Sequence, residues 1–388
     1  MKMYTQWLGS AALAALLTAG IAGCGSDSGS SGSVSGTITP YERIAVIPGT
    51  WDDVLAIADQ IGTYVDTTDE NATLGYPTNW IVAGANHTLG EDYNTTDLLP
   101  IPVGANKSRV VELCNSAYAT KAMSTGRVHG PALPCEVSVH SDGTNVYVDM
   151  LNADAIFSIF FTDINDTDGT MEGIASDVKS EIRGMVMAAL ADKNPTESWQ
   201  ALGPVFDAKA MDDVSYTTPY IVYKYQNGGV FTSTDAKNLA KDIIAKLGTD
   251  TATADTNVPG LSSGSAWRSG RPEPLAIPGV QVVEACSPKY AKKATALGTE
   301  YITALPCEIA VYVDETDSTG ETLAISFLNP NFMFGTMFGG AVEKAYAAGT
   351  ITKDDVIEYS TLAEVVFGDL RLIVDAAVQE SALGLQVK

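Results

Sequence analysis

The sequence predicts an α+β protein made of two tandem copies of one two-layer domain, each a mostly antiparallel sheet with helices on one face. Two observations lead to this class. A stretch of thirty residues recurs without a gap 172 positions later, and both copies show the same succession of strand, helix, strand, helix, hairpin and helices. The length of 388 residues also fits two domains.

The repeat joins residues 110–139 to residues 282–311, which are identical at fifteen of thirty positions. After a hairpin that is five residues longer in the second copy, the match resumes at Leu151 and Leu328. Only two copies are present, and each is too long to be a solenoid unit. We therefore infer a duplicated domain.

Each copy begins with a predicted strand, residues 43–47 or 220–225, followed by an amphipathic helix. Thr50 with Asp53 forms a capping box in the first copy, and Ser233 or Thr234 is the expected cap in the second.

The repeated core then contains a strand that ends in a cysteine, a short helix, an alternating hairpin and a helix rich in Phe and Met. Both copies close on a long helix, predicted over 171–191 and 353–379. The Phe/Met helices are core elements or, alternatively, line an apolar pocket between sheet and helix.

The first 24 residues resemble a lipoprotein signal peptide. A short apolar run ends in Ile21-Ala22-Gly23-Cys24, where small residues precede the thiol that would be acylated. A Ser/Gly-rich tether follows, and such acylation would anchor the chain in the lipid bilayer. Because Gly25 follows the cysteine, the sequence resembles an outer-membrane sorting signal of Gram-negative bacteria, so we expect a cell-envelope lipoprotein.

These features divide the chain as follows: signal peptide 1–24, tether 25–38, first repeat 39–192, linker 193–218 and second repeat 219–388.

The net charge of −24 excludes nucleic acid as a natural partner, because a strongly acidic surface repels phosphates. It also disfavours acidic substrates.

Four cysteines occupy equivalent positions in the two copies, and Cys114 and Cys135 are 21 positions apart, as are Cys286 and Cys307. In an oxidising compartment the first interpretation is one structural disulfide in each repeat. The alternatives are a redox-active or sulfur-handling pair, thiolate binding of a metal or haem, and inert buried thiols.

Two glutamates of each repeat stand next to these strand cysteines, namely Glu112 and Glu136, and Glu284 and Glu308. Such residues lie either on a solvated face or in a cleft as functional carboxylates. The histidines at 129 and 140 are replaced by tyrosine in the second copy, which argues against duplicated histidine catalysis.

An acidic segment offers a weak candidate for calcium. It contains the ligand types of a calcium loop, but their spacing is off by one, and the second copy has two glycines there instead. The other interpretation is an acidic turn before the next helix. The candidate ligands are Asp163, Asn165, Asp166 and Asp168.

The repeated motifs resemble domain-of-unknown-function family 302 (DUF302). The residues that carry the resemblance are the Val-Val-Glu-x-Cys strands, the Ala-Leu-Pro-Cys-Glu segments and Leu328-Asn329-Pro330, where the first copy has Ala153 in place of proline. The resemblance implies a compact α+β sandwich similar to the TATA-binding-protein-like folds and a tendency of the domains to pair. It implies no particular activity.

We find no nucleotide-binding, nucleophile-elbow or metalloprotease motif in the sequence. We therefore expect a non-enzymatic binding protein without a cofactor, in which a pseudo-dimer of repeats holds a small apolar ligand or an envelope protein. A thiol-based redox or sulfur-handling protein and a purely structural envelope component are the alternatives.

Overall fold

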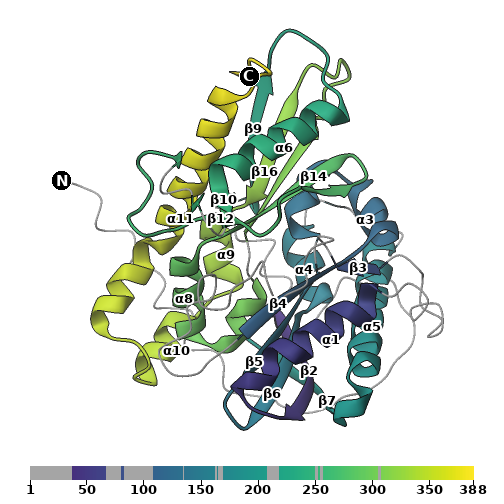
Figure 1. Cartoon of the computed structure of the whole chain (residues 1–388), viewed down its shortest axis with the longest axis vertical. Helices are drawn as coiled ribbons and strands as arrows, with labels where there is room; N and C mark the ends of the chain where they lie inside the picture. Colours follow the sequence, from purple (N-terminus) through teal and green to yellow (C-terminus); the bar gives the residue numbers. More distant parts are fainter. Residues whose placement is uncertain are drawn as a thin grey trace. The chain divides into compact units, whose positions relative to one another are not determined.

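The computed structural model describes residues 37–66, 80–82, 108–133, 135–161, 164, 169–207, 218–249, 252–253, 257–304 and 307–388. Within these residues each repeat contains one antiparallel sheet accompanied by helices, which can be followed by colour in Figure 1. This confirms the predicted α+β class and the two repeated domains.

The first repeat has a six-stranded sheet of order β3-β4-β5-β6-β2-β7. Its strands are β2 (Tyr41–Pro48), β3 (Trp80–Val82), β4 (Ser108–Asn115), β5 (Cys135–Ser141), β6 (Asn145–Leu151) and β7 (Thr196–Leu202). Its helical segments are η2 (Trp51–Asp53), α1 (Val54–Asp66), α3 (Ser116–Met123), η3 (Arg127–Ala132), α4 (Ala153–Phe160), α5 (Thr170–Ala189) and η4 (Ala191–Lys193).

The second repeat has the corresponding order β12-β14-β15-β16-β9-β17, with β13 also paired to β14. Its strands are β9 (Tyr220–Gln226), β12 (Arg268–Ser269), β13 (Leu275–Ile277), β14 (Val280–Cys286), β15 (Cys307–Val313), β16 (Leu323–Leu328) and β17 (Gln386–Val387). Its helical segments are α6 (Ser233–Leu247), α8 (Pro288–Leu297), η6 (Thr299–Ala304), α9 (Pro330–Thr336), α10 (Ala341–Ala347) and α11 (Lys353–Glu380).

Two further two-stranded ladders join β1 (Thr37–Ile38) to β8 (Phe206–Asp207), and β10 (Gly248–Thr249) to β11 (Ala252–Thr253).

Local sequence explains where the helices begin. Thr50 forms the predicted capping box with Asp53, and Thr352 forms another with Asp355 at the start of α11. In the second repeat the cap of α6 is Thr232, which pairs with Asp235, so the expectation of Ser233 or Thr234 is wrong. The carboxylate three residues after the cap decides this position, because it must reach back to the backbone N–H of the cap.

The stretch expected to link the repeats contributes to the first sheet. Within 193–218, β7 pairs with β2, and the short strand β8 pairs with β1. In the same way β17, near the end of the chain, pairs with β9. An additional edge strand therefore completes both sheets at equivalent places.

Both faces of each sheet are buried, and alternate residues of a strand point to opposite faces. Residues such as Val111 and Val137 lie in the core with α1, while α6 covers β14 and β15 in the second repeat beside α11 (Figure 1). On the opposite face, the short 3-10 helix of the other repeat packs on the strands: η3 contacts β14, β15 and β16, and η6 contacts β4, β5 and β6.

Reciprocal hydrogen bonds accompany this packing. The Tyr41 hydroxyl donates to the carbonyl of Met337 at 3.0 Å, and the Tyr220 hydroxyl donates to the carbonyl of Phe160 at 2.8 Å. These four residues occupy equivalent places in the two repeats, so the contact has approximate two-fold symmetry. The stretch of aligned sequence thus encodes both a domain and the surface on which its copy packs.

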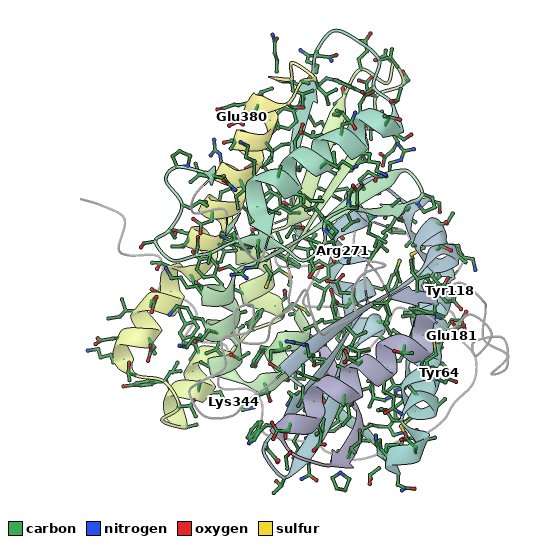
Figure 2. The ribbon with its side chains drawn as sticks, viewed as in Figure 1. Tyr64, Tyr118, Glu181, Arg271, Lys344 and Glu380 are labelled. Carbon is green, nitrogen blue, oxygen red and sulfur yellow. The ribbon has the colours of Figure 1, made fainter. Side chains whose placement is uncertain are left out.

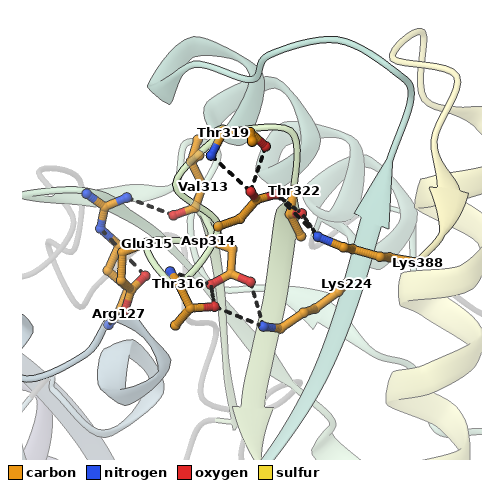
Figure 3. Close-up of polar contacts among 10 residues, drawn as sticks. Arg127, Lys224, Val313, Asp314, Glu315, Thr316, Thr319, Thr322 and Lys388 are labelled. Carbon is orange, nitrogen blue, oxygen red and sulfur yellow. Dashed lines mark hydrogen bonds and ion pairs between the residues drawn. The ribbon is translucent and has the colours of Figure 1, made fainter.

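One edge of the contact involves the loop between β15 and β16, shown in Figure 3. Arg127 of η3 donates through Nη1 to the carbonyl of Val313 at 2.7 Å and through its backbone N–H to Glu315 at 2.6 Å. Within the second repeat, Lys224 pairs with Asp314, and Lys388 pairs with Asp317 at 3.3 Å.

Among the described helices, none has both the length and the apolar composition needed to cross a membrane.

Candidate functional site

Each repeat contains an apolar pocket at the cysteine-bearing end of its sheet. The first pocket lies among β3, the junction of β4 with α3, and the helices α4 and α5, and it encloses about 520 Å³, part of which is open to solvent. The second pocket has the same position in its repeat and encloses about 720 Å³.

The two pockets are built from equivalent residues. Ten positions within the aligned sequence line the first pocket and have counterparts that line the second. The pairs are Asn115/Ser287, Tyr118/Tyr290, Ala119/Ala291, Ala122/Ala294, Ala132/Ala304, Cys135/Cys307, Leu151/Leu328, Ala153/Pro330, Ile156/Met333 and Phe157/Phe334. The alternative interpretation of the Phe/Met helices, as the lining of a pocket, therefore agrees with the structure.

A buried carboxylate stands behind two lining residues of each pocket, a tryptophan and a tyrosine, without lining the pocket itself. In the first repeat, Glu181 of α5 accepts hydrogen bonds from Trp80 Nε1 and from the Tyr118 hydroxyl, both at 2.6 Å. Figure 2 labels Tyr118 and Glu181, which lie close together. Burial, followed by this hydrogen bond, raises the pKa of Tyr118 above its usual value.

The second repeat has the same arrangement. Asp369 of α11 accepts from Trp267 Nε1 at 3.0 Å and from the Tyr290 hydroxyl at 2.8 Å. Both repeats therefore fix a tryptophan and a tyrosine against the pocket through one carboxylate, and these hydroxyl and indole donors are engaged within the protein.

Sequence reasoning missed these carboxylates, although a signal was present. On α5 the buried stripe runs through Ile174, Val178, Glu181 and Met185, so a charged residue stands where helical spacing expects an apolar one. Asp369 interrupts the buried stripe of α11 in the same way. The tryptophans are harder to find, because they lie in the long segments that do not align.

One polar group of the first pocket has no partner within the described residues. Asn115 caps α3 through its side-chain oxygen, while its buried Nδ2 makes no hydrogen bond. Its counterpart Ser287 donates to the carbonyl of Ser265 at 2.5 Å. The first pocket therefore offers a donor that the second does not.

The expected disulfides are not present, since Cys114, Cys135, Cys286 and Cys307 are all free. The strands are antiparallel neighbours as predicted, but Cys135 stands opposite Leu113, not opposite Cys114. Because side chains alternate along a strand, the two sulfurs leave opposite faces of the sheet. The second repeat has the same register, with Cys307 opposite Ala285.

Burial keeps these thiols protonated. Desolvation by burial and, to a smaller extent, the proximity of Glu308 raise the pKa of Cys114 and of Cys307 to about 12. The pKa values of Cys135 and Cys286 are also raised, again chiefly by burial. Since the thiolate is the nucleophile and the metal ligand, this environment opposes both chemistries.

The four glutamates predicted as cleft carboxylates come together where the repeats meet. Glu112 stands opposite Glu136, and Glu284 opposite Glu308, in the two central strand pairs. All four are buried, so a solvated face is wrong for them. Strand alternation places them on the sheet faces that are not covered by α1 and α6.

Arg271, labelled in Figure 2, joins this cluster. Its guanidinium pairs with Glu112 of the first repeat and, through Nε at 3.3 Å, with Glu284 of its own repeat. Burial lowers the pKa of Arg271 to about 10, which leaves it charged at neutral pH.

The remaining two glutamates form no ion pair within the described part of the chain, although the proximity of Arg271 lowers the pKa of Glu308 in part. Burial raises the pKa of Glu136 and of Glu308 well above the usual range, and for Glu308 the proximity of Glu136 raises it further. Among the described residues, both oxygens of Glu308 and Oε2 of Glu136 have no hydrogen-bond partner.

Two predicted sites fall outside the described residues: the acylation site Cys24, and the calcium candidates Asp163, Asn165, Asp166 and Asp168. Within the described residues, no group of three or more His, Cys, Asp or Glu side chains has the arrangement of a metal site.

Comparison with solved structures finds an uncharacterised conserved DUF302 protein from Bacillus stearothermophilus, at 12% identity and a TM-score of 0.23, covering 38% of this chain and 94% of that one. It also finds the di-domain ARO/CYC BexL from the BE-7585A biosynthetic pathway, at 10% identity and a TM-score of 0.18, covering 88% of this chain and 98% of that one. No curated protein matches the sequence.

Residues 102–189 and 274–353 match the family model of DUF302, a domain of unknown function, and the chain therefore contains two tandem DUF302 domains.

Proposed function

We propose that the protein is a binding protein and that each repeat holds a small, uncharged, mostly apolar molecule in its pocket. The observation that carries this proposal is the recurrence of one pocket in two diverged copies. Where the lining residues differ, as at Ile156/Met333 and Ala153/Pro330, they stay apolar. Repetition of the same enclosed space on both sides of a duplication supports a shared use of that space.

The lining sets the class of ligand. None of the described residues that line either pocket has a charged side chain, and a charged ligand group would lose its hydration there without a compensating partner. In the first pocket the free Nδ2 of Asn115 suits an oxygen acceptor on the ligand. An alcohol, ketone or ester with an apolar body meets these requirements.

The thiol alternative receives less support. Cys135 lines the first pocket, and both Cys286 and Cys307 line the second. Burial raises the pKa of all three thiols, and the proximity of Arg268 offsets this only in part for Cys286. We therefore assign these cysteines to the pocket wall as apolar side chains.

We further propose that acylation of Cys24 holds the protein at a membrane of the cell envelope. The support for this is the small-residue segment that precedes Cys24 in the sequence. Cys24→Ala should move the protein from the membrane to the soluble fraction of the cells that produce it. Continued membrane association of this variant would contradict the assignment.

Calorimetric titration with 1-octanol tests the binding proposal on the full chain carrying Cys24→Ala. Burial of eight carbons at ~0.8 kcal/mol each predicts two sites with a Kd on the order of tens of micromolar. Ala122→Leu should fill the first pocket and Ala294→Leu the second, each reducing the stoichiometry from two sites to one.

Ala56→Leu, at an exposed position of α1, is the matched control and should keep both sites. Thermal unfolding verifies that each variant is folded. Absence of binding to the parent chain, or two sites persisting in both pocket variants, would overturn the proposal. If the parent chain does not bind 1-octanol, a structural role for the repeats explains the duplicated domain better than ligand binding.

A further inference from the structure

A third cavity lies between the two pockets, at the contact of the repeats. It has an empty volume of about 350 Å³, part of which is open to solvent, and it takes its lining from both repeats. Ala132, Leu151 and Ile156 line both this junction cavity and the first pocket. Their equivalents Ala304, Leu328 and Met333 line both the junction cavity and the second pocket.

The shared residues place the junction cavity between the other two, which have no lining residue in common. Each boundary consists of one small alanine and two larger apolar side chains. Met333 in particular rotates about three bonds and adapts its shape readily. Rotamer changes at Leu151 and Met333 can therefore open the two boundaries without movement of the backbone.

Among the described residues that line the junction cavity, Glu136 has the single polar side chain. This glutamate is buried, and its Oε2 has no hydrogen-bond partner within the described residues. Its equivalent, Glu308, does not line the cavity. The approximate symmetry of the repeats is thus broken at the one place where a ligand in the cavity would meet a polar atom.

We propose that the three cavities form one continuous site, in which a single elongated apolar chain spans both repeats and accepts a hydrogen bond from Glu136 through an uncharged oxygen near its middle. This inference rests on the proposed function, since the two end pockets must bind apolar groups. Burial raises the pKa of Glu136, so the carboxyl group is protonated and able to donate.

The chemistry of the lining excludes other occupants of the junction. A carboxylate or phosphate would lie beside a carboxyl group without a cation in the lining, and a metal ion would find only one ligand residue. A ketone, ester or ether oxygen accepts one hydrogen bond and adds no charge.

The test uses 8-pentadecanone, which has a carbonyl between two seven-carbon arms, and 1-octanol as the short probe. Native mass spectrometry of the full chain carrying Cys24→Ala should detect two octanol molecules but only one ketone molecule bound. Two bound ketones would show separate pockets and overturn this inference while leaving the proposed function intact. If neither probe binds, the proposed function itself fails.

Blocking the junction tests the continuity of the site. Met337 lines the junction cavity but neither end pocket, and its equivalent in the first repeat is Phe160, so Met337→Phe places a ring that the other repeat already accommodates. The affinity for 8-pentadecanone should fall by about tenfold or more, while two octanol molecules still bind. Unchanged ketone affinity would contradict a path through the junction.

The role of Glu136 is tested by comparing the ketone with n-pentadecane in competition calorimetry. One hydrogen bond corresponds to a preference of about fivefold, which Glu136→Leu should abolish and Glu136→Gln should retain, because an amide also donates. Glu308→Leu is the matched control outside the cavity and should leave the preference unchanged. If Glu136→Leu and Glu308→Leu reduced the preference for the ketone equally, Glu136 would not be its hydrogen-bond donor.

Discussion

At the scale of single residues, the cysteines show how register decides chemistry. The repeated 21-residue spacing suggested a disulfide in each domain, and the strands do pair as that idea requires. The pairing of Cys135 with Leu113, however, directs the sulfurs of Cys135 and Cys114 to opposite faces of the sheet. A shift of one residue in register therefore separates a structural disulfide from two buried thiols.

Alkylation by iodoacetamide should detect this difference. With a pKa of about 12, Cys114 and Cys307 have roughly one thiolate in ten thousand at pH 8, and burial slows the reagent further. We expect no label on the folded chain carrying Cys24→Ala in the time that free glutathione reacts fully. After unfolding in urea without reductant, four groups should add, one on each remaining cysteine. A requirement for reductant before labelling would show disulfides instead.

At the scale of secondary-structure elements, prediction succeeded where the signal was local. The strand ending in Cys286 begins at Val280 as expected, and Thr50 and Thr352 cap their helices through side chains three residues away. The alternation of the hairpins and the helical spacing of apolar residues likewise act over a few positions.

Elements that depend on distant partners were not predictable in this way. β7 consists largely of exposed residues, and it becomes a strand because β2 offers it an edge. The glutamates at 112 and 136 looked like solvent-facing strand residues until a second repeat covered them. In both cases the deciding contact joins residues far apart in the sequence, which a single sequence does not reveal.

The 3-10 helices η3 and η6 also depend on distant partners, because each packs on the sheet of the other repeat. A Cβ atom added to Gly130 of η3 would lie 2.8 Å from the Cβ of Ala310 and 3.0 Å from Cγ1 of Val280. Gly130→Ala should therefore lower the free energy of unfolding by about 1–3 kcal/mol through overpacking. Urea denaturation measures this change.

The control for Gly130→Ala is Gly173→Ala, on the exposed side of α5, where an added Cβ meets nothing within 4 Å. This substitution should raise the free energy of unfolding by about 0.5–1 kcal/mol, because alanine favours a helix over glycine. If both variants were stabilised, the close approach of η3 to β14 and β15 would be wrong.

At the scale of the whole molecule, duplication has produced a contact that is similar on both sides but not identical. Tyr41 and Tyr220 make equivalent hydrogen bonds across it, yet Arg271 provides one cation for four buried glutamates. The arginine forms ion pairs with Glu112 and Glu284, and it lowers the pKa of Glu308 only in part, so that Glu136 and Glu308 are buried without an ion pair among the described residues. Because an unpaired buried carboxylate is costly, these two groups are stable there mainly in the protonated form.

This arrangement predicts a specific dependence of stability on pH. A glutamate whose pKa is raised by folding binds a proton more tightly in the folded than in the unfolded state. Its contribution to the free energy of unfolding is fully present below the unfolded pKa near 4.3 and is lost as the pH rises through the folded pKa. Each such group lowers the free energy of unfolding by up to about 1.4 kcal/mol per pH unit within that window.

Glu136→Gln removes one of these titrations while preserving the shape of the side chain. Burial of the amide costs the same free energy at every pH. The test therefore compares the free energies of unfolding of variant and parent and follows how their difference changes with pH. From pH 4 to pH 7 this difference should move in favour of the variant by more than about 1 kcal/mol, as measured by urea unfolding at each pH. Glu321→Gln, at an exposed position, should show no such trend. A pH-independent difference for Glu136→Gln would mean that this carboxyl group is charged in the folded protein and that the junction contains a counter-ion not identified among the described residues.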